Sequence, residues 1–203
     1  MDVYSVVRAQ GLRRWLALVV TETLSPTVLV IVLTTLVSVH ASNSLTRGLR
    51  IAALAVLFSV ALPYAVLLAG IRAGRLTDRD LRRREERPAM MAVALTSVAA
   101  GLVLLRRMDA PADVFALMAA IGAGVAVTLG ISTVWKISVH TSCVAGTVVS
   151  LALLLHPSAL LLAPLTPLAA WARLLLGHHT VRQTVAGAVV GAVVAAGVLV
   201  LLS

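Results

Sequence analysis

Two segments in the second half of the chain place basic and imidazole side chains at the edges of apolar stretches. The first, "WKISVHTSC", carries Lys136 and His140, and the second, "WARLLLGHHTVRQ", carries Arg173 and His179. Lysine and arginine bind phosphate oxygens, and the planar fork of arginine grips two at once. Imidazole acts as a nucleophile or a proton donor near neutral pH. Together these residue types indicate phosphoryl-transfer chemistry.

Gln183 follows His179 by four residues, about one helical turn. If a helix has begun there, its amide oxygen accepts the proton on the far ring nitrogen of His179 and aims the other nitrogen at phosphorus. Arg173 is a different case, because six positions on a continuous helix turn two side chains about 240° apart. A break at Gly177 would bring Arg173 and His179 together.

The composition indicates that these segments lie in a membrane. The chain has 203 residues, of which 60% are hydrophobic and 12% charged, and a formal net charge of +9. A soluble domain of this size needs far more charge to cover its surface. A hydrocarbon core of about 30 Å takes roughly 20 apolar residues per helix. We therefore expect an all-α integral membrane protein, a bundle of six to seven transmembrane helices.

Seven apolar stretches are bounded by Arg, Pro, Gly or His. The fifth is the weakest, because it is short and opens with polar residues. Residues 1–23 carry clustered Arg and Glu22, which argues against deep burial, and we predict an interfacial segment there. Residues 24–203 are predicted to form a single transmembrane bundle. The predicted spans are 24–40, 50–70, 89–105, 112–134, 141–156, 158–176 and 184–202.

Basic residues are concentrated on one side of this topology. With seven spans, the N-terminus and the loops around 71–88, 135–141 and 173–183 share a side. That side carries all but four of the 17 Lys and Arg, the exceptions being Arg47, Arg50, Arg106 and Arg107. The positive-inside rule makes it the cytoplasmic side. We predict a multi-pass protein of the cell membrane with its active site on the cytoplasmic face.

Three of the predicted helices begin on that same side. Each helix N-terminus exposes unpaired backbone N–H groups and about half a positive charge, which favours an anion. The third span begins next to Pro88, and the fifth and seventh begin near His140 and His179. With Arg87, Lys136 and Arg173 added, the shared region is suited to binding phosphate.

The spacing of these residues resembles the motifs of the type-2 phosphatidic acid phosphatase superfamily, membrane lipid phosphatases related to vanadium haloperoxidases. The family's third motif is S-R-x5-H-x3-D, and here Ala172-Arg173 is followed by five residues, His179, three residues and Gln183. Its second motif is P-S-G-H, and here the residues are Ile137, Ser138, Val139 and His140.

The first family motif, K-x6-R-P, is matched at its end by Arg87-Pro88. Asp80 occupies the Lys position, and Arg83 or Arg84 is the substitute cation. Gln183 also departs from the family, because it stands where the motif has an Asp that orients and charge-stabilises the nucleophilic His. The resemblance covers the chain from about residue 72 to the C-terminus.

The resemblance implies a role for each matching residue. His179 would form a phosphohistidine, and His140 would protonate the leaving lipid oxygen. No metal or other cofactor is implied. His178 is the other candidate nucleophile, but the motif spacing favours His179. The predicted phosphate-binding residues are Arg87, Lys136, Ser138, Arg173, Arg83 and Arg84.

The function we expect is metal-independent hydrolysis of an isoprenoid phosphate or diphosphate, or a related lipid phosphate. The alternatives are a phosphatidate or glycerolipid phosphate phosphatase, a metal-dependent prenyl diphosphate enzyme using Asp78 and Asp80, and a non-catalytic lipid-phosphate binder. The expected partners are the lipid phosphate substrate and membrane lipids, without nucleic acid. Gly187 and Gly191 predict a close helix contact, more often inside a bundle than between copies; a homo-oligomer through this face is the alternative.

The predicted sidedness can be tested by cysteine labelling. In a Cys143→Ala background, Arg83→Cys should react with a membrane-impermeant maleimide only after the cells are permeabilised, because its loop is predicted to be cytoplasmic. Asn43→Cys, between the first two predicted spans, should react in intact cells. Labelling of Arg83→Cys in intact cells would place the basic loop outside.

Overall fold

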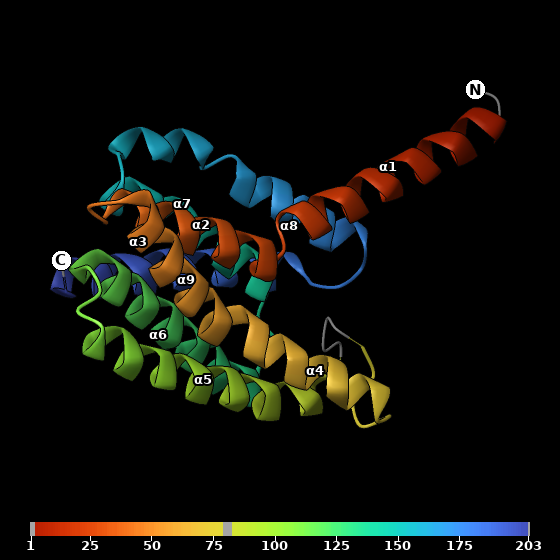
Figure 1. Cartoon of the computed structure of the whole chain (residues 1–203). Helices are drawn as coiled ribbons and strands as arrows, with labels where there is room; N and C mark the ends of the chain where they lie inside the picture. Colours follow the sequence, from red (N-terminus) through yellow and green to blue (C-terminus); the bar gives the residue numbers. More distant parts are fainter. Residues whose placement is uncertain (1–2, 79–82, 203) are drawn as a thin grey trace.

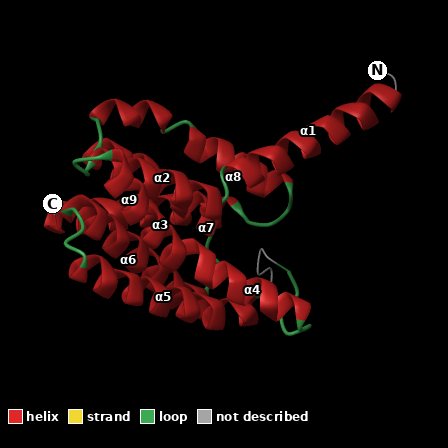
Figure 2. Ribbon diagram, viewed as in Figure 1, coloured by secondary structure: helices red, strands yellow, loops and turns green. Residues whose placement is uncertain are grey.

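The computed structural model describes residues 3–78 and 83–202, without the side chains of residues 3–10, Arg84 and Arg87. Throughout this described part the regular structure is helical, with no strand (Figure 2). The fold is all-α, as the sequence predicts.

Twelve helical elements follow one another along the described chain. Most are α-helices; η1 is a π-helical segment, and η2 and η3 are short 3-10 helices. The elements are α1 (Val3–Thr23), α2 (Pro26–His40), α3 (Leu45–Val56), η1 (Leu57–Ala61), α4 (Leu62–Arg72), η2 (Arg84–Glu86), α5 (Arg87–Arg107), α6 (Ala112–Val134), α7 (Val139–Leu154), η3 (Pro157–Leu162), α8 (Leu165–Leu175) and α9 (Val181–Leu202).

Five helical stretches of the described chain are long and apolar enough to cross a membrane. These are Leu45–Arg72, Pro88–Arg107, Ala112–Val134, Pro157–Leu175 and Val181–Leu202. A sixth results if Gly11–Thr23 and Pro26–His40, which meet at a bend of 41°, form one span. The chain is therefore a multi-pass membrane protein. Each of the seven predicted stretches contains a helix, and the fifth, α7, is the shorter apolar one with 16 residues.

Local signals fix where the helices begin. Ser25 caps α2, its Oγ accepting the N–H of Val28, and Pro26 occupies the first turn, where its missing N–H costs nothing. Ser44 caps α3 in the same way. Pro88 lies in the first turn of α5, as predicted.

The helices run back and forth, so that the connections collect at two ends of the bundle (Figure 1). The loops between α4 and α5, α6 and α7, and α8 and α9 lie toward one end, and the C-terminus lies at the other with the α2–α3 and α5–α6 connections. Helix α1 projects away from the bundle, and its C-terminal part lies beside α8. The residues singled out from the sequence therefore share one end, which we call the basic end.

One carboxylate links the two sides of the loop between α4 and α5. Glu86 accepts hydrogen bonds from the backbone N–H and the hydroxyl of Thr77, at 3.1 and 2.6 Å. The hydroxyl bond, the backbone bond and the charge of Arg83 hold the pKa of Glu86 below its usual value. Arg83 itself is exposed in this loop.

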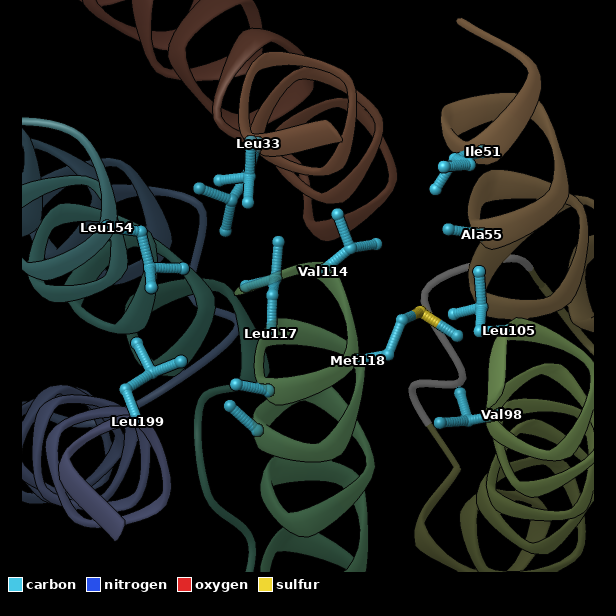
Figure 3. Close-up of a cluster of buried hydrophobic side chains, with 13 residues drawn as sticks. Leu33, Ile51, Ala55, Val98, Leu105, Val114, Leu117, Met118, Leu154 and Leu199 are labelled. Carbon is cyan, nitrogen blue, oxygen red and sulfur yellow. The ribbon is translucent and has the colours of Figure 1, made fainter. Parts of the chain in front are cut away.

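The hydrophobic core lies toward the opposite end. In Figure 3, Met118 of α6 points toward Leu105 and Val98 of α5, and Leu117 points toward Leu33 of α2. The end of α7 and the end of α9 add Leu154 and Leu199 to the same cluster. The packing of large apolar side chains is thus concentrated away from the basic end.

Helices α7 and α9 form the closest helix contact. A Cβ built on Gly191 would overlap the carbonyl oxygen of Ser142, and one built on Gly187 would overlap that of Ser138. These glycines allow the two backbones to touch inside the bundle, as small residues do in membrane proteins. The predicted packing role is confirmed. The face packs against α7 within the chain, and a homo-oligomer through it stays a prediction.

The α7–α9 contact predicts a difference between two glycines of α9. Gly191→Ala should lower the melting temperature of the detergent-solubilised protein, because overpacking costs typically ~1–3 kcal/mol. Gly197→Ala is the matched control, since its Cβ meets nothing within 4 Å, and the better helix propensity of Ala should leave it as stable as wild type or slightly more so. Equal melting temperatures for the two variants would contradict the contact.

Candidate active site

Arg173 lies in the last turn of α8, and Gly177 ends that helix. The N–H of His178 donates to the carbonyl of Arg173 at 3.0 Å, the N–H of Gly177 donates to that of Leu174 at 3.0 Å, and Gly177 has φ +69°. These features define a Schellman motif with glycine in the left-handed position. The predicted break at Gly177 is confirmed, and the chain reverses there.

Helix α9 begins with a reciprocal capping box. The N–H of Gln183 donates to Thr180 Oγ1 at 3.4 Å, and the N–H of Thr180 donates to Gln183 Oε1 at 3.1 Å. The "TVRQ" stretch carries this signal in the sequence. Gln183 therefore has a structural role in starting the helix in addition to its predicted role beside His179.

The same amide oxygen contacts the predicted nucleophile. His179 Nδ1 lies 3.2 Å from Gln183 Oε1. Because the N–H of Thr180 requires an acceptor, the atom facing it is the oxygen of the amide and not its nitrogen. Nδ1 of His179 must then be the donor, which leaves the lone pair on Nε2. The predicted orienting contact is present.

His140 lies in the first turn of α7, next to the start of α9. The N–H of Ser138 donates to the carbonyl of Gln183 at 3.2 Å, and Thr141 Oγ1 donates to the carbonyl of Thr184 at 2.9 Å. These two bonds join the starts of α7 and α9. They fix the position of His140 relative to His179, although the two residues lie far apart in the sequence.

One cavity of about 540 Å³ receives three of the predicted residues. Arg173, His140 and His179 all line it, and we call it the central cavity. Arg173 is only 3% exposed, so its charge acts on an occupant in surroundings of low dielectric. Most of the remaining wall is apolar and comes from α2, α4, α5, α6, α7 and α9.

Other predicted residues do not reach this wall. Lys136 is half-buried and Ser138 is buried, but neither lines the cavity; the Ser138 side chain caps α7 by accepting the N–H of Thr141 at 3.5 Å. Arg83 is exposed in its loop. His178 also lies outside the lining. The side chains of Arg84 and Arg87 and the whole of Asp80 lie outside the described residues.

The sequence reasoning missed the contribution of α1. Thr21 and Glu22, in its last turn, both line the central cavity. Glu22 is exposed, as expected, yet it supplies a carboxylate to the wall that carries Arg173 and the two histidines. The signal was the Ser25-Pro26 pair, which starts a new helix and allows the bend that turns α1 toward α8. Tyr64 of α4 was also missed, and nothing in its sequence surroundings marks it.

The geometry is suited to holding a phosphate group beside two imidazoles. The buried guanidinium of Arg173 is suited to binding phosphoryl oxygens, and the N-termini of α7 and α9 lie near the two histidines. Among the described residues, no three His, Cys, Asp or Glu side chains gather as a metal site requires. The chain matches no protein-family model, no curated protein and no solved structure.

The two roles of Gln183 can be separated by mutation. Gln183→Leu should lower turnover of a lipid phosphate by about 10²-fold or more, because it removes the acceptor that orients His179. Thr180→Val removes only the cap hydroxyl, costs ~1 kcal/mol of stability and should keep turnover within a few-fold of wild type. Gln183→Glu retains both hydrogen bonds and adds a charge that stabilises the imidazolium, so its turnover should equal or exceed wild type.

Initial rates of phosphate release for the three variants, with their melting temperatures, provide the measurement. If Gln183→Leu and Thr180→Val lose the same stability and the same activity, Gln183 acts only as a helix cap.

Proposed function

We propose that this protein is a metal-independent membrane phosphatase that hydrolyses an isoprenoid phosphate or diphosphate, or a related lipid phosphate, through a phosphohistidine. The observation that carries the proposal is the meeting of Arg173, His140 and His179 on the wall of one largely apolar cavity. The sequence motifs resemble those of lipid phosphatases, and the cavity combines a cationic end with a lining suited to a hydrocarbon chain.

In the first step, Nε2 of His179 attacks phosphorus, and the bond from phosphorus to the lipid oxygen breaks. The hydrogen bond from Nδ1 to Gln183 Oε1 supports this, because it gives Nε2 the lone pair. His140 donates its proton to the leaving oxygen, which needs that proton to depart as an alcohol or a phosphate. Arg173 holds the phosphoryl oxygens as charge accumulates on them.

In the second step, water attacks the phosphohistidine and the bond from phosphorus to Nε2 breaks. His140, now neutral, accepts a proton from that water, which restores both histidines. Gln183 stabilises the cationic ring of the intermediate with the dipole of its amide. A carboxylate at the same position would stabilise that ring more strongly, with a full negative charge. We therefore expect slower formation of the intermediate than with a carboxylate at this position.

The excess of basic residues in the loops at the basic end, by the positive-inside rule, supports a cytoplasmic position for the proposed site at the cell membrane. Isoprenoid phosphates are favoured as substrates, because a cytoplasmic site meets these intermediates where they are made. Phosphatidate or a related glycerolipid phosphate is the second choice.

A non-catalytic lipid-phosphate binder is the second candidate function. It is favoured by one observation, the capping box of α9, because that box gives Gln183 a structural reason to be present without catalysis. Such a protein would hold a lipid phosphate at Arg173 without releasing phosphate.

The choice of nucleophile gives the decisive test. His179→Ala should abolish phosphate release from a prenyl phosphate, because it removes the atom that attacks phosphorus. His178→Ala is the matched control and should keep nearly wild-type turnover, since His178 does not line the cavity. The measurement is phosphate release by purified protein, with and without EDTA.

The outcomes separate the candidates. Release that continues in EDTA and disappears in His179→Ala supports the proposal. Release that stops in EDTA indicates a metal-dependent enzyme, and a wild-type protein that binds a prenyl phosphate without releasing phosphate is a binder. Loss of activity in His178→Ala with retention in His179→Ala would show that the nucleophile is His178.

A further inference from the structure

The central cavity has a polar end and an apolar floor. The three residues of the proposed chemistry lie at the basic end, whereas Leu33, Leu117 and Ala120 belong both to the cavity wall and to the hydrophobic core. Part of the core, including Leu33 and Leu117 in Figure 3, therefore also forms part of the cavity wall. On α6 the wall extends from Thr128 to Leu117, about 16 Å of helix.

The volume of the cavity limits what it can hold. A closed apolar cavity of ~150 Å³ accepts one benzene molecule, so the ~540 Å³ here corresponds, at the same density, to about 20 carbon atoms. That is one long hydrocarbon chain. The two acyl chains of a common diacyl glycerolipid together contain many more carbons than this volume encloses.

Gly124 is a gap in the side-chain surface that α6 presents to the cavity. Gly124 lies on α6 between Thr128 and Leu117 and lines the cavity, and a Cβ added there meets nothing within 4 Å. A larger side chain at this position would enter the cavity between its polar end and its floor, without first displacing a neighbour.

We propose that the central cavity holds the single hydrocarbon chain of a one-chain lipid phosphate, and that the open space at Gly124 sets the longest chain accepted. This inference rests on the proposed function for the position of the phosphate at Arg173 and His179. A prenyl phosphate and a one-chain glycerolipid phosphate share the required chemistry, a phosphate on one long chain. The cavity then selects among lipid phosphates by the number and length of their hydrocarbon chains more than by their headgroup.

Two substrate comparisons and a matched pair of variants test the inference. Lysophosphatidate and phosphatidate carry the same headgroup and differ by one chain, so kcat/KM should be at least about ten-fold higher for lysophosphatidate. Comparing kcat/KM for a prenyl phosphate of about 20 carbons with that for one half as long tests how long a chain the cavity accepts. Comparing the longer prenyl phosphate with lysophosphatidate shows which kind of single chain is preferred.

The matched pair consists of two glycines of α6 with open space at Cβ. Gly124→Leu fills the cavity and should lower the ratio of kcat/KM for the longer prenyl phosphate to that for the shorter one by about ten-fold. Gly130→Leu lies on the same helix away from the cavity and should leave the ratio unchanged. Gly124→Ala, the smaller change, should shift the ratio in the same direction by less, which covers a failure of the leucine variant to fold.

Thermal stabilisation by non-hydrolysable prenyl phosphonates of the same two lengths separates this inference from the proposed function. If no lipid phosphate is hydrolysed but the longer phosphonate stabilises wild type and not Gly124→Leu, hydrolysis is refuted and the one-chain site stands. If phosphate is released equally fast from phosphatidate and lysophosphatidate, or if both Gly124 variants keep the wild-type length ratio, the one-chain site is refuted and hydrolysis stands.

Discussion

The close approach of α7 and α9 is the contact on which the candidate site depends. Gly187 and Gly191 let the α9 backbone rest on the carbonyl oxygens of α7, and side chains at either position would force the helices apart. At this distance Ser138 and Thr141 of α7 reach carbonyls at the start of α9. His140 and His179 take their relative position from this contact. Two glycines of α9 thus determine how the two imidazoles are placed relative to each other.

The bundle divides the tasks of stability and binding between its two ends. Large side chains of six helices, α2, α3, α5, α6, α7 and α9, pack together toward the end with the C-terminus. Toward the basic end the same helices enclose a cavity instead. Helix α7 is about 24 Å long, shorter than a hydrocarbon core of ~30 Å.

The sequence was sufficient for the fold class, the apolar stretches and the break at Gly177, because hydrophobic length and glycine geometry are local properties. The contact between His179 and Gln183 was also predicted, from a spacing of one helical turn, although His179 lies before the cap of α9 and the capping box brings the Gln183 amide to it. The participation of Thr21, Glu22 and Tyr64 was not predictable, because it depends on how α1 and α4 pack against distant helices. Ser138 shows the opposite limit: its position in the motif suggested a phosphate ligand, but the local need of α7 for a cap directs its hydroxyl inward.

The number of residues between Arg173 and His179 follows from how α8 ends and how α9 begins. Arg173 is the residue whose carbonyl closes the Schellman motif, and His179 directly precedes the cap of the next helix. The residues between Arg173 and His179 end α8 at a left-handed glycine and lead directly into the capping box that starts α9. In this chain, lengthening or shortening the interval would separate the two side chains from the helix ends that hold them, because the Schellman motif and the capping box set that length of backbone.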